Sequence, residues 1–300
     1  MVTATRPSCQ RLGGQVNQYE WFWQSKPLQI TSESLGEGSP ILLLPPFSTV
    51  STRAEVAPLA RALATRYQAI ALDWPGFGDS DRPPVDYGPE LYGQFLQAFV
   101  EAHFSEPIRV VAAGHAAGYV LQLATAELWS KLVLVAPTWQ GPLAVMGAPA
   151  SLRSGVCQLV RSPLVGQALY YLNTRPAFLK WMFSRHVFAD AQHITPELLI
   201  ERYQGTQKPG ARYAPAGFVT GQLDPFTAQS DWLALTEATT QKDIPIMVVL
   251  AEQAPPSSKA NMEALAAIEA VQSVRLPGSL GMVEEQAGAI ATAIFPFLAE

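Results

Sequence analysis

The sequence is poor in several residue types on which secreted, metal-binding and nucleic-acid-binding proteins depend. It has only two cysteines, Cys9 and Cys157, so we expect neither a disulfide nor a thiolate metal site. Charged residues make up 15% of the chain and the net charge is −5, which argues against binding of nucleic acid. There is no uncharged apolar run of about 18 residues and no signal-peptide pattern, so we expect a cytoplasmic protein.

Histidine is also scarce, and it bears directly on catalysis. The four histidines are His103, His115, His186 and His193, and none follows residue 193. A histidine base in the C-terminal third of the chain is therefore excluded. We also find no clustered metal ligands and no cofactor motif, so we expect no metal and no cofactor.

Apolar residues are abundant, at 48%, and they are arranged in short continuous runs. Runs of this kind are typical of strands buried on both faces of a parallel sheet, and helical patterns separate them. Alternating strands and helices predict a doubly wound α/β sheet. The predicted strands lie at 41–44, 67–73, 108–114, 131–137, 244–251 and 273–278, after an N-terminal hairpin or edge pair.

The alternation is interrupted once, by helical patterns over residues 139–222. We expect a flexible segment over 1–18, a core formed by 19–138 and 223–300, and a helical lid insertion over 139–222. The insertion carries eight Lys and Arg against three acidic residues, whereas the rest of the chain carries twelve basic and twenty-two acidic residues. The lid is therefore basic and the core acidic.

The stretch "VVAAGHAAGYVLQLA", residues 110–124, has the glycine spacing of a nucleophile elbow, G-x-S-x-G, at a junction of strand and helix. Gly114 and Gly118 bracket the motif, but Ala116 stands where the nucleophile belongs. An alanine with a left-handed backbone there would be strained by roughly 1–3 kcal/mol. Either the turn has relaxed or the packing of the following helix maintains it.

A second motif, "LDWPGFGDSDRP" at residues 72–83, resembles the loop D-x-P-G-x-G-x-S of the α/β-hydrolase superfamily. With the elbow and the order of strands, it makes the chain similar to that superfamily from about Tyr19 to its end, including hydrolase-like chains of cyanobacteria and plastids. The resemblance implies an α/β-hydrolase fold, with about eight mostly parallel strands flanked by helices and a helical lid insertion.

The resemblance also implies where the catalytic groups would lie. The family needs a nucleophile, an acid and a histidine in that chain order. The matching positions hold Ala116, Ala254 and Ser279, so the Ser–Asp–His triad is absent. The backbone N–H groups of Ala117 and Phe47 match the family's oxyanion hole, although Pro45 and Pro46 replace its usual His-Gly.

Several other side chains have two interpretations. His115 is a weak candidate for an acid or base, or a buried histidine bonded to a loop carbonyl. Ser48, Ser80 and Ser279 either line a pocket or stabilise turns. Cys157 is a buried small apolar residue or a nucleophile, and Asp224 is a cap that closes the lid or a catalytic acid.

Residues 169–188 mix aromatic side chains with Arg175, Lys180 and Arg185. One interpretation is a peripheral contact with an anionic membrane surface or an acidic protein partner. The other is an amphipathic lid whose apolar face covers the pocket.

From these observations we predict a non-catalytic binding or scaffold protein with an apolar or lipid-like ligand, or a protein partner, at the lid. The alternative is an atypical enzyme of the same fold, a hydrolase or lyase, that uses His115. A third hypothesis is an esterase with a relocated nucleophile. The predicted ligand-binding residues are Phe47, Ser48, His115, Ala116, Ala117, Trp139 and Ser279.

Overall fold

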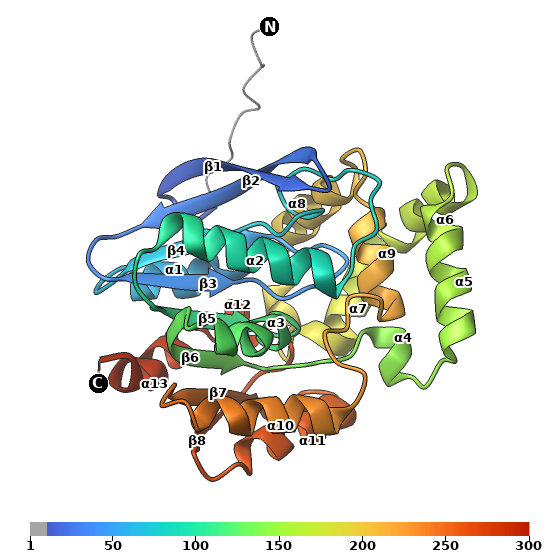
Figure 1. Ribbon diagram of the computed structural model, residues 1–300. Helices are drawn as coiled ribbons and strands as arrows, with labels where there is room; N and C mark the ends of the chain where they lie inside the picture. The colour runs from blue at the N-terminus through green and yellow to red at the C-terminus, as the bar shows by residue number, and fades with distance from the viewer. Residues whose placement is uncertain (1–10, 300) are drawn as a thin grey trace, which may run out of the picture.

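A single eight-stranded sheet forms the centre of the molecule in the computed structural model, which describes residues 11–299 (Figure 1). The order of strands across the sheet is β1-β2-β4-β3-β5-β6-β7-β8. The pairs β1–β2 and β2–β4 are antiparallel, and all other neighbouring pairs are parallel. The strands are β1 (Gln15–Trp23), β2 (Lys26–Leu35), β3 (Pro40–Leu44), β4 (Gln68–Leu72), β5 (Ile108–Ala113), β6 (Trp129–Val135), β7 (Ile246–Ala251) and β8 (Val271–Leu276).

The central strands are apolar because helices cover both faces of the sheet. All six residues of β7 are buried, as are four of the five in β3. On one face α1 (Ala57–Leu63) packs against α12 (Met282–Glu285) and α13 (Ala287–Ala299). The other face carries α2 (Pro89–His103), α3 (Ala116–Gln122), α10 (Gln229–Thr240) and α11 (Pro256–Ala266). The predicted α/β-hydrolase fold is thereby confirmed.

The insertion lies between β6 and β7 and projects from the sheet on the right of Figure 1. Its helices are α4 (Pro142–Val145), α5 (Ala150–Arg161), α6 (Val165–Asn173), α7 (Pro176–Met182), α8 (Pro196–Thr206) and α9 (Tyr213–Thr220). All residues from 139 to 222 are described, and none of them is in a strand. A small apolar core of its own, including Leu179, Phe183 and Phe188, holds the middle of the insertion together.

The N-terminal boundary of the core differs from the expectation. We predicted a flexible segment up to residue 18, but β1 begins at Gln15 and Leu12 is buried. The Glu33 carboxylate accepts the backbone N–H groups of Leu12, Gly13 and Gly14, which fixes this turn. A buried acid 20 residues away was not recognisable as its partner from the sequence. The first ten residues of that segment, and Cys9 with them, lie outside the described part of the chain.

None of the helices in residues 11–299 has the length and apolar character needed to cross a bilayer. No three His, Cys, Asp or Glu side chains in this part of the chain are grouped so that they could hold a metal ion.

Candidate active site

The turn between β5 and α3 has relaxed from the geometry of a nucleophile elbow. Its left-handed residue is Gly114, with φ of +54°, and His115 already has right-handed helical angles (φ −67°, ψ −22°). Ala116 begins α3 and is not among the residues with positive φ. The alanine therefore carries none of the backbone strain that the motif could have imposed. Gly118 is needed for a different reason, since a Cβ there would collide with Pro225.

The position of the missing nucleophile is closed. Ala116 and Ala117 are both fully buried. The Ala117 N–H, which matches one donor of an oxyanion hole, is directed at the carbonyl oxygen of Gly114 at 3.3 Å. The carbonyl-binding site that the resemblance implied therefore has one of its two N–H donors engaged in a turn.

Aromatic side chains fill the space on the other side of this turn. Phe47 is buried and stacks on Trp74, with ring centroids 4.8 Å apart. It also contacts Tyr92 edge-on at 4.8 Å and Tyr119 at 5.4 Å. We call Phe47, Trp74, Phe77, Tyr92 and Tyr119 the aromatic cluster. Because these rings pack at the distances preferred by aromatic pairs, the predicted ligand residue Phe47 is part of a filled interior.

The His115 ring makes one hydrogen bond within residues 11–299. Its Nε2 lies 3.1 Å from the carbonyl oxygen of Leu223, which can only accept, so this nitrogen carries the proton. Burial lowers the pKa of His115 to about 4, and the imidazole is neutral at pH 7. Its Nδ1 is buried without a hydrogen-bond partner in residues 11–299. The bond to a loop carbonyl is the one that the structural interpretation of His115 expected.

Asp224 lies beside this histidine and ties the two ends of the insertion together. Its Oδ1 accepts the backbone N–H of Gly141 at 2.8 Å and is 3.4 Å from His115 Nε2. Burial raises the pKa of Asp224 to about 7. With His115 neutral, the pair is not a salt bridge at neutral pH. The contact with Gly141 agrees with a residue that closes the lid.

Of the other two positions that match the triad, one contacts the insertion and the other lies in a turn of the core. Ser279 donates its hydroxyl to the carbonyl oxygen of His186 at 3.3 Å, and the Gly281 N–H bonds Val187 at 2.7 Å. The Glu285 carboxylate accepts the backbone N–H of Asp190 nearby, at 2.7 Å. Ala254 is a buried residue in the turn after β7.

The remaining candidates have structural partners as well. Ser48 Oγ accepts the Val50 N–H at 3.1 Å, and Ser80 Oγ bridges Thr31 N and Asp73 O. The Cys157 thiol is buried, which raises its pKa, and it contacts the Gln222 side chain at 3.2 Å. Trp139 is also buried, and its Nε1 has no hydrogen-bond partner in the described residues.

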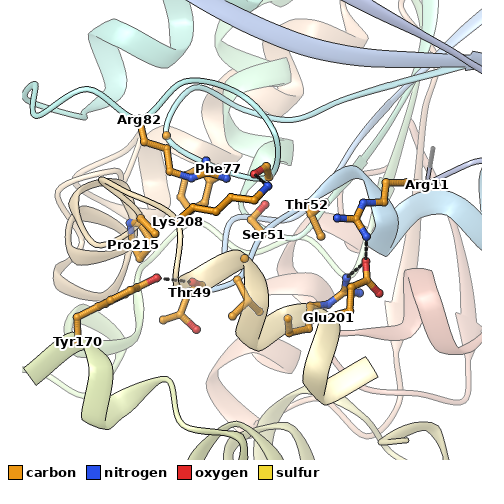
Figure 2. Close-up of a pocket in the computed structure, with 16 residues that line it drawn as sticks. Arg11, Thr49, Ser51, Thr52, Phe77, Arg82, Tyr170, Glu201, Lys208 and Pro215 are labelled. Carbon is orange, nitrogen blue, oxygen red and sulfur yellow. Dashed lines mark hydrogen bonds and ion pairs between the residues drawn. The ribbon is translucent and has the colours of Figure 1, made fainter. Parts of the chain in front are cut away.

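A small cavity lies elsewhere, between the core and the insertion (Figure 2). Its volume is about 30 Å³. The core contributes Thr49, Ser51, Phe77 and Arg82, and the insertion contributes Tyr170, Arg202, Lys208 and Pro215, among others. Neither this cavity nor a second one near Arg61 is lined by His115 or Ala116.

Three of the four basic residues at the cavity are paired with acids. Arg11 binds Glu201 at 2.6 Å, Arg202 binds Glu284 at 2.8 Å, and Lys208 binds Asp79. Arg82 has no hydrogen bond or ion pair within residues 11–299, and burial lowers its pKa despite the more distant Asp73 and Asp79. Sequence analysis missed Arg82. The only signal was a basic residue two positions after the D-x-P-G-x-G-x-S loop.

The comparisons with known proteins agree with this architecture. The profile described as the alpha/beta hydrolase family matches residues 41–293. Similar solved structures include the haloalkane dehalogenase DatA from Agrobacterium tumefaciens C58, with 18% identity, a TM-score of 0.70, and coverage of 96% of this chain and 98% of the other. No curated protein sequence matches the chain.

Two further structures are similar to the same extent. A thermophilic esterase from Thermogutta terrifontis has 18% identity and a TM-score of 0.69, covering 95% of this chain and 98% of its own. Cfl2 from Burkholderia cenocepacia has 20% identity and a TM-score of 0.67, covering 96% and 97%. At these identities the similarity to solved structures shows the fold alone. The family is shown by the profile match, which covers most of the chain. The chain belongs to the alpha/beta hydrolase family.

Proposed function

We propose that this chain is a non-catalytic member of its family that binds an apolar or lipid-like molecule between the core and the helical insertion. The observation that carries the proposal is the state of position 116. The side chain there is a methyl group, it is fully buried, and its backbone is an ordinary helical turn. A nucleophile must be exposed to its substrate and activated by a base, and this position offers neither.

The other triad positions support the same conclusion. Ala254 has no ionisable group, and Ser279 bonds the backbone of the insertion. Ser279 thus contacts the lid at the position where a catalytic histidine would act. The cavity between core and insertion has room for the polar end of a bound molecule, and it does not involve position 116.

The test is turnover of p-nitrophenyl esters from acetate to palmitate by the purified protein, with His115→Gln in parallel. We expect no turnover above that of the heat-inactivated protein at any chain length. A thermal shift with the matching free fatty acids and alcohols then reports binding. Turnover by the native protein would contradict the proposal.

A second candidate function is an enzyme centred on His115, and one observation favours it. The Nε2 of His115 lies 3.4 Å from the Asp224 carboxyl group, and the unprotonated Nδ1 on the other side of the ring has no partner in residues 11–299. The solved structures of similar fold include a dehalogenase and an esterase. Ester turnover that His115→Gln abolishes would establish this candidate, and turnover unchanged by that substitution would indicate a relocated nucleophile.

A further inference from the structure

We infer that the cavity at Arg82 binds the carboxylate group of an apolar monocarboxylate. The inference rests on the proposed ligand-binding function and names the ligand class. Figure 2 shows Arg82, Lys208 and Tyr170 reaching the cavity from different elements, namely the loop after β4, the turn after α8, and α6.

The charge balance around the cavity leaves one positive charge without a partner. Arg11, Arg202 and Lys208 each bind an acidic side chain, whereas Arg82 has none in residues 11–299. Arg82 is partly buried, and a guanidinium in that position loses part of its hydration without a compensating bond to an anion. One unpaired positive charge matches a monovalent anion. A divalent anion would bring excess negative charge close to Asp79 and Glu201.

The size and the walls of the cavity agree with a carboxylate. A volume of about 30 Å³ holds roughly two or three water-sized groups, about the size of a carboxylate. The Thr49 hydroxyl at the cavity is buried and lacks a hydrogen-bond partner. A guanidinium presents two parallel N–H groups to such a ligand. Val50, Phe77 and Pro215 supply apolar walls for the part of the ligand next to it.

The test compares sodium octanoate with octan-1-ol by isothermal titration calorimetry on the full chain. We expect octanoate to bind at least about tenfold more tightly than the alcohol, because only the carboxylate pairs with Arg82. Arg82→Gln should lose about tenfold or more of the octanoate affinity, and Arg82→Lys should recover part of it. The matched control is Arg66→Gln, which removes the same charge from an exposed arginine. Arg66 lies over the Phe295 ring.

The outcomes separate this inference from the proposed function. Equal binding of octanoate and octanol, unchanged in Arg82→Gln, would overturn the carboxylate site and leave the apolar-ligand function standing. If neither compound binds, the ligand-binding function fails as well. Binding of inorganic phosphate in preference to octanoate would also overturn the inference.

A different observation, on the outside of the insertion, carries a second inference. Of the eleven large apolar side chains that are exposed in residues 11–299, ten lie between residues 145 and 200. They include Leu152 and Leu159 on α5, Leu164 and Val165 at the start of α6, Leu172 at its end, and Trp181 on α7. We call these six the exposed apolar set. Their helices pack in succession, α5 on α6 and α6 on α7, and an accumulation of exposed apolar side chains is typical of a contact surface.

The same helices lack negative charge. No Asp or Glu occurs from residue 139 to 189, a stretch that contains five basic residues. Arg175, Lys180 and Arg185 are exposed and have no acidic partner in residues 11–299. The Arg175 guanidinium lies over the Tyr171 ring at 5.0 Å, which places the positive charge beside α6.

We propose that α5, α6 and α7 dock on an anionic lipid bilayer. Basic side chains bind the headgroups, and the exposed apolar set enters the boundary below them. A symmetric contact with a second copy would bring the two basic insertions together. The acidic core of a second copy is a poor partner for the exposed apolar set. Phe22 is the one large apolar side chain that is exposed on the described part of the core.

Vesicle flotation tests this docking with phosphatidylcholine alone and with phosphatidylcholine containing phosphatidylserine. We expect binding to the anionic vesicles only, decreasing as salt is raised. Neutralising Arg175, Lys180 and Arg185 to Gln together should weaken binding on the order of a hundredfold. Leu164→Ser with Trp181→Ser should weaken it at any salt concentration.

Matched controls change the core instead, with Phe22→Ser for the apolar group and Lys26→Gln with Lys242→Gln for the charges. These variants should bind vesicles as the native chain does. Equal binding to neutral vesicles, or no effect of the three neutralising substitutions, would overturn the docking surface. A dimer in light scattering that those substitutions dissociate would assign the surface to a second copy.

Discussion

The core and the insertion use the same residue types for opposite purposes. In the core, Trp74 is fully buried, stacks on Phe47 and donates its Nε1–H to Pro45 at 2.9 Å. In the insertion, Trp181 is 52% exposed. An aromatic side chain packed on all sides stabilises the fold, whereas one left in water is available for binding.

Charged residues show the same contrast. Arg53 in the core is completely buried, with Glu33 3.1 Å away and Asp73 and Asp79 also bound to it. Arg175, Lys180 and Arg185 in the insertion are exposed and without an acidic partner in residues 11–299. The core therefore uses charge to hold its loops, and the insertion presents charge to its surroundings.

The largest effect is expected from the two tryptophans. Trp74→Ala should lower the free energy of unfolding by about 3–5 kcal/mol, because it opens a cavity in the aromatic cluster. Trp181→Ala should change it by no more than about 0.5 kcal/mol, since its ring is half in water. Urea denaturation followed by circular dichroism measures both. Equal losses would mean that the insertion ring is also structural.

The buried ion network gives a second effect of similar size. Arg53→Gln should cost about 3–5 kcal/mol, because Glu33 and Asp73 would remain buried without their cation. Arg275→Gln, at a pair with Glu263 in which both side chains are over a third exposed, should cost far less, because water screens an exposed ion pair. The same urea denaturation measures both variants, and a small loss for Arg53→Gln would contradict the importance of the network.

Asp224 should make stability depend on pH. Its pKa is about 7 in the folded chain because of burial, against about 4 when unfolded. Between these values the folded state binds more protons, so this carboxyl lowers the free energy of unfolding as pH rises. Asp224→Asn should therefore gain stability relative to the native chain from about pH 4.5 to pH 7.5, by up to roughly 4 kcal/mol.

His115 provides the opposite slope and so a control. Burial lowers its pKa to about 4, so the folded state binds fewer protons than the unfolded chain between that value and its usual 6.5. Its contribution to stability rises with pH in that window. His115→Gln should thus lose stability relative to the native chain over the same range. Parallel pH profiles for both variants and the native protein would contradict these assignments.

The smallest effect is expected at the former nucleophile position. Ala116→Ser should cost about 1–3 kcal/mol, because it buries a hydroxyl at a packed helix start. It should produce no ester turnover, since no base lies in the position to activate the hydroxyl. Ala177→Ser on the exposed side of α7 should change stability by no more than about 0.5 kcal/mol. Measurable turnover by Ala116→Ser would show that a usable base remains.

The core could be predicted from the sequence because its strands are buried on both faces. The apolar run at 108–114 became β5 (Ile108–Ala113), and that at 244–251 became β7 (Ile246–Ala251). Such runs have few alternative structures. The glycines of the elbow were also recognisable, although their roles differ: Gly114 supplies the left-handed turn and Gly118 the close approach to Pro225.

The insertion was harder to predict because an amphipathic pattern does not say what covers each apolar side chain. In residues 169–188, Leu179, Phe183 and Phe188 are buried in the insertion's own core, whereas Tyr171, Leu172 and Trp181 are exposed. The stretch therefore has both a buried face, as expected for an amphipathic lid, and exposed aromatic and apolar side chains, as a peripheral contact would need. Docking on a membrane remains a prediction.

The sequence by itself determined the order of strands and helices along the chain and which residues occupy the positions of the family's motifs, because these depend only on residue identity and chain order. Ala116 stands at the centre of the elbow, and no histidine follows residue 193. Only the tertiary structure decided that Ser279 holds the insertion at His186 and that Arg82 has no partner in residues 11–299. Burial and pairing depend on which segments, far apart in the sequence, come into contact in the fold. A local sequence pattern carries no information about those contacts.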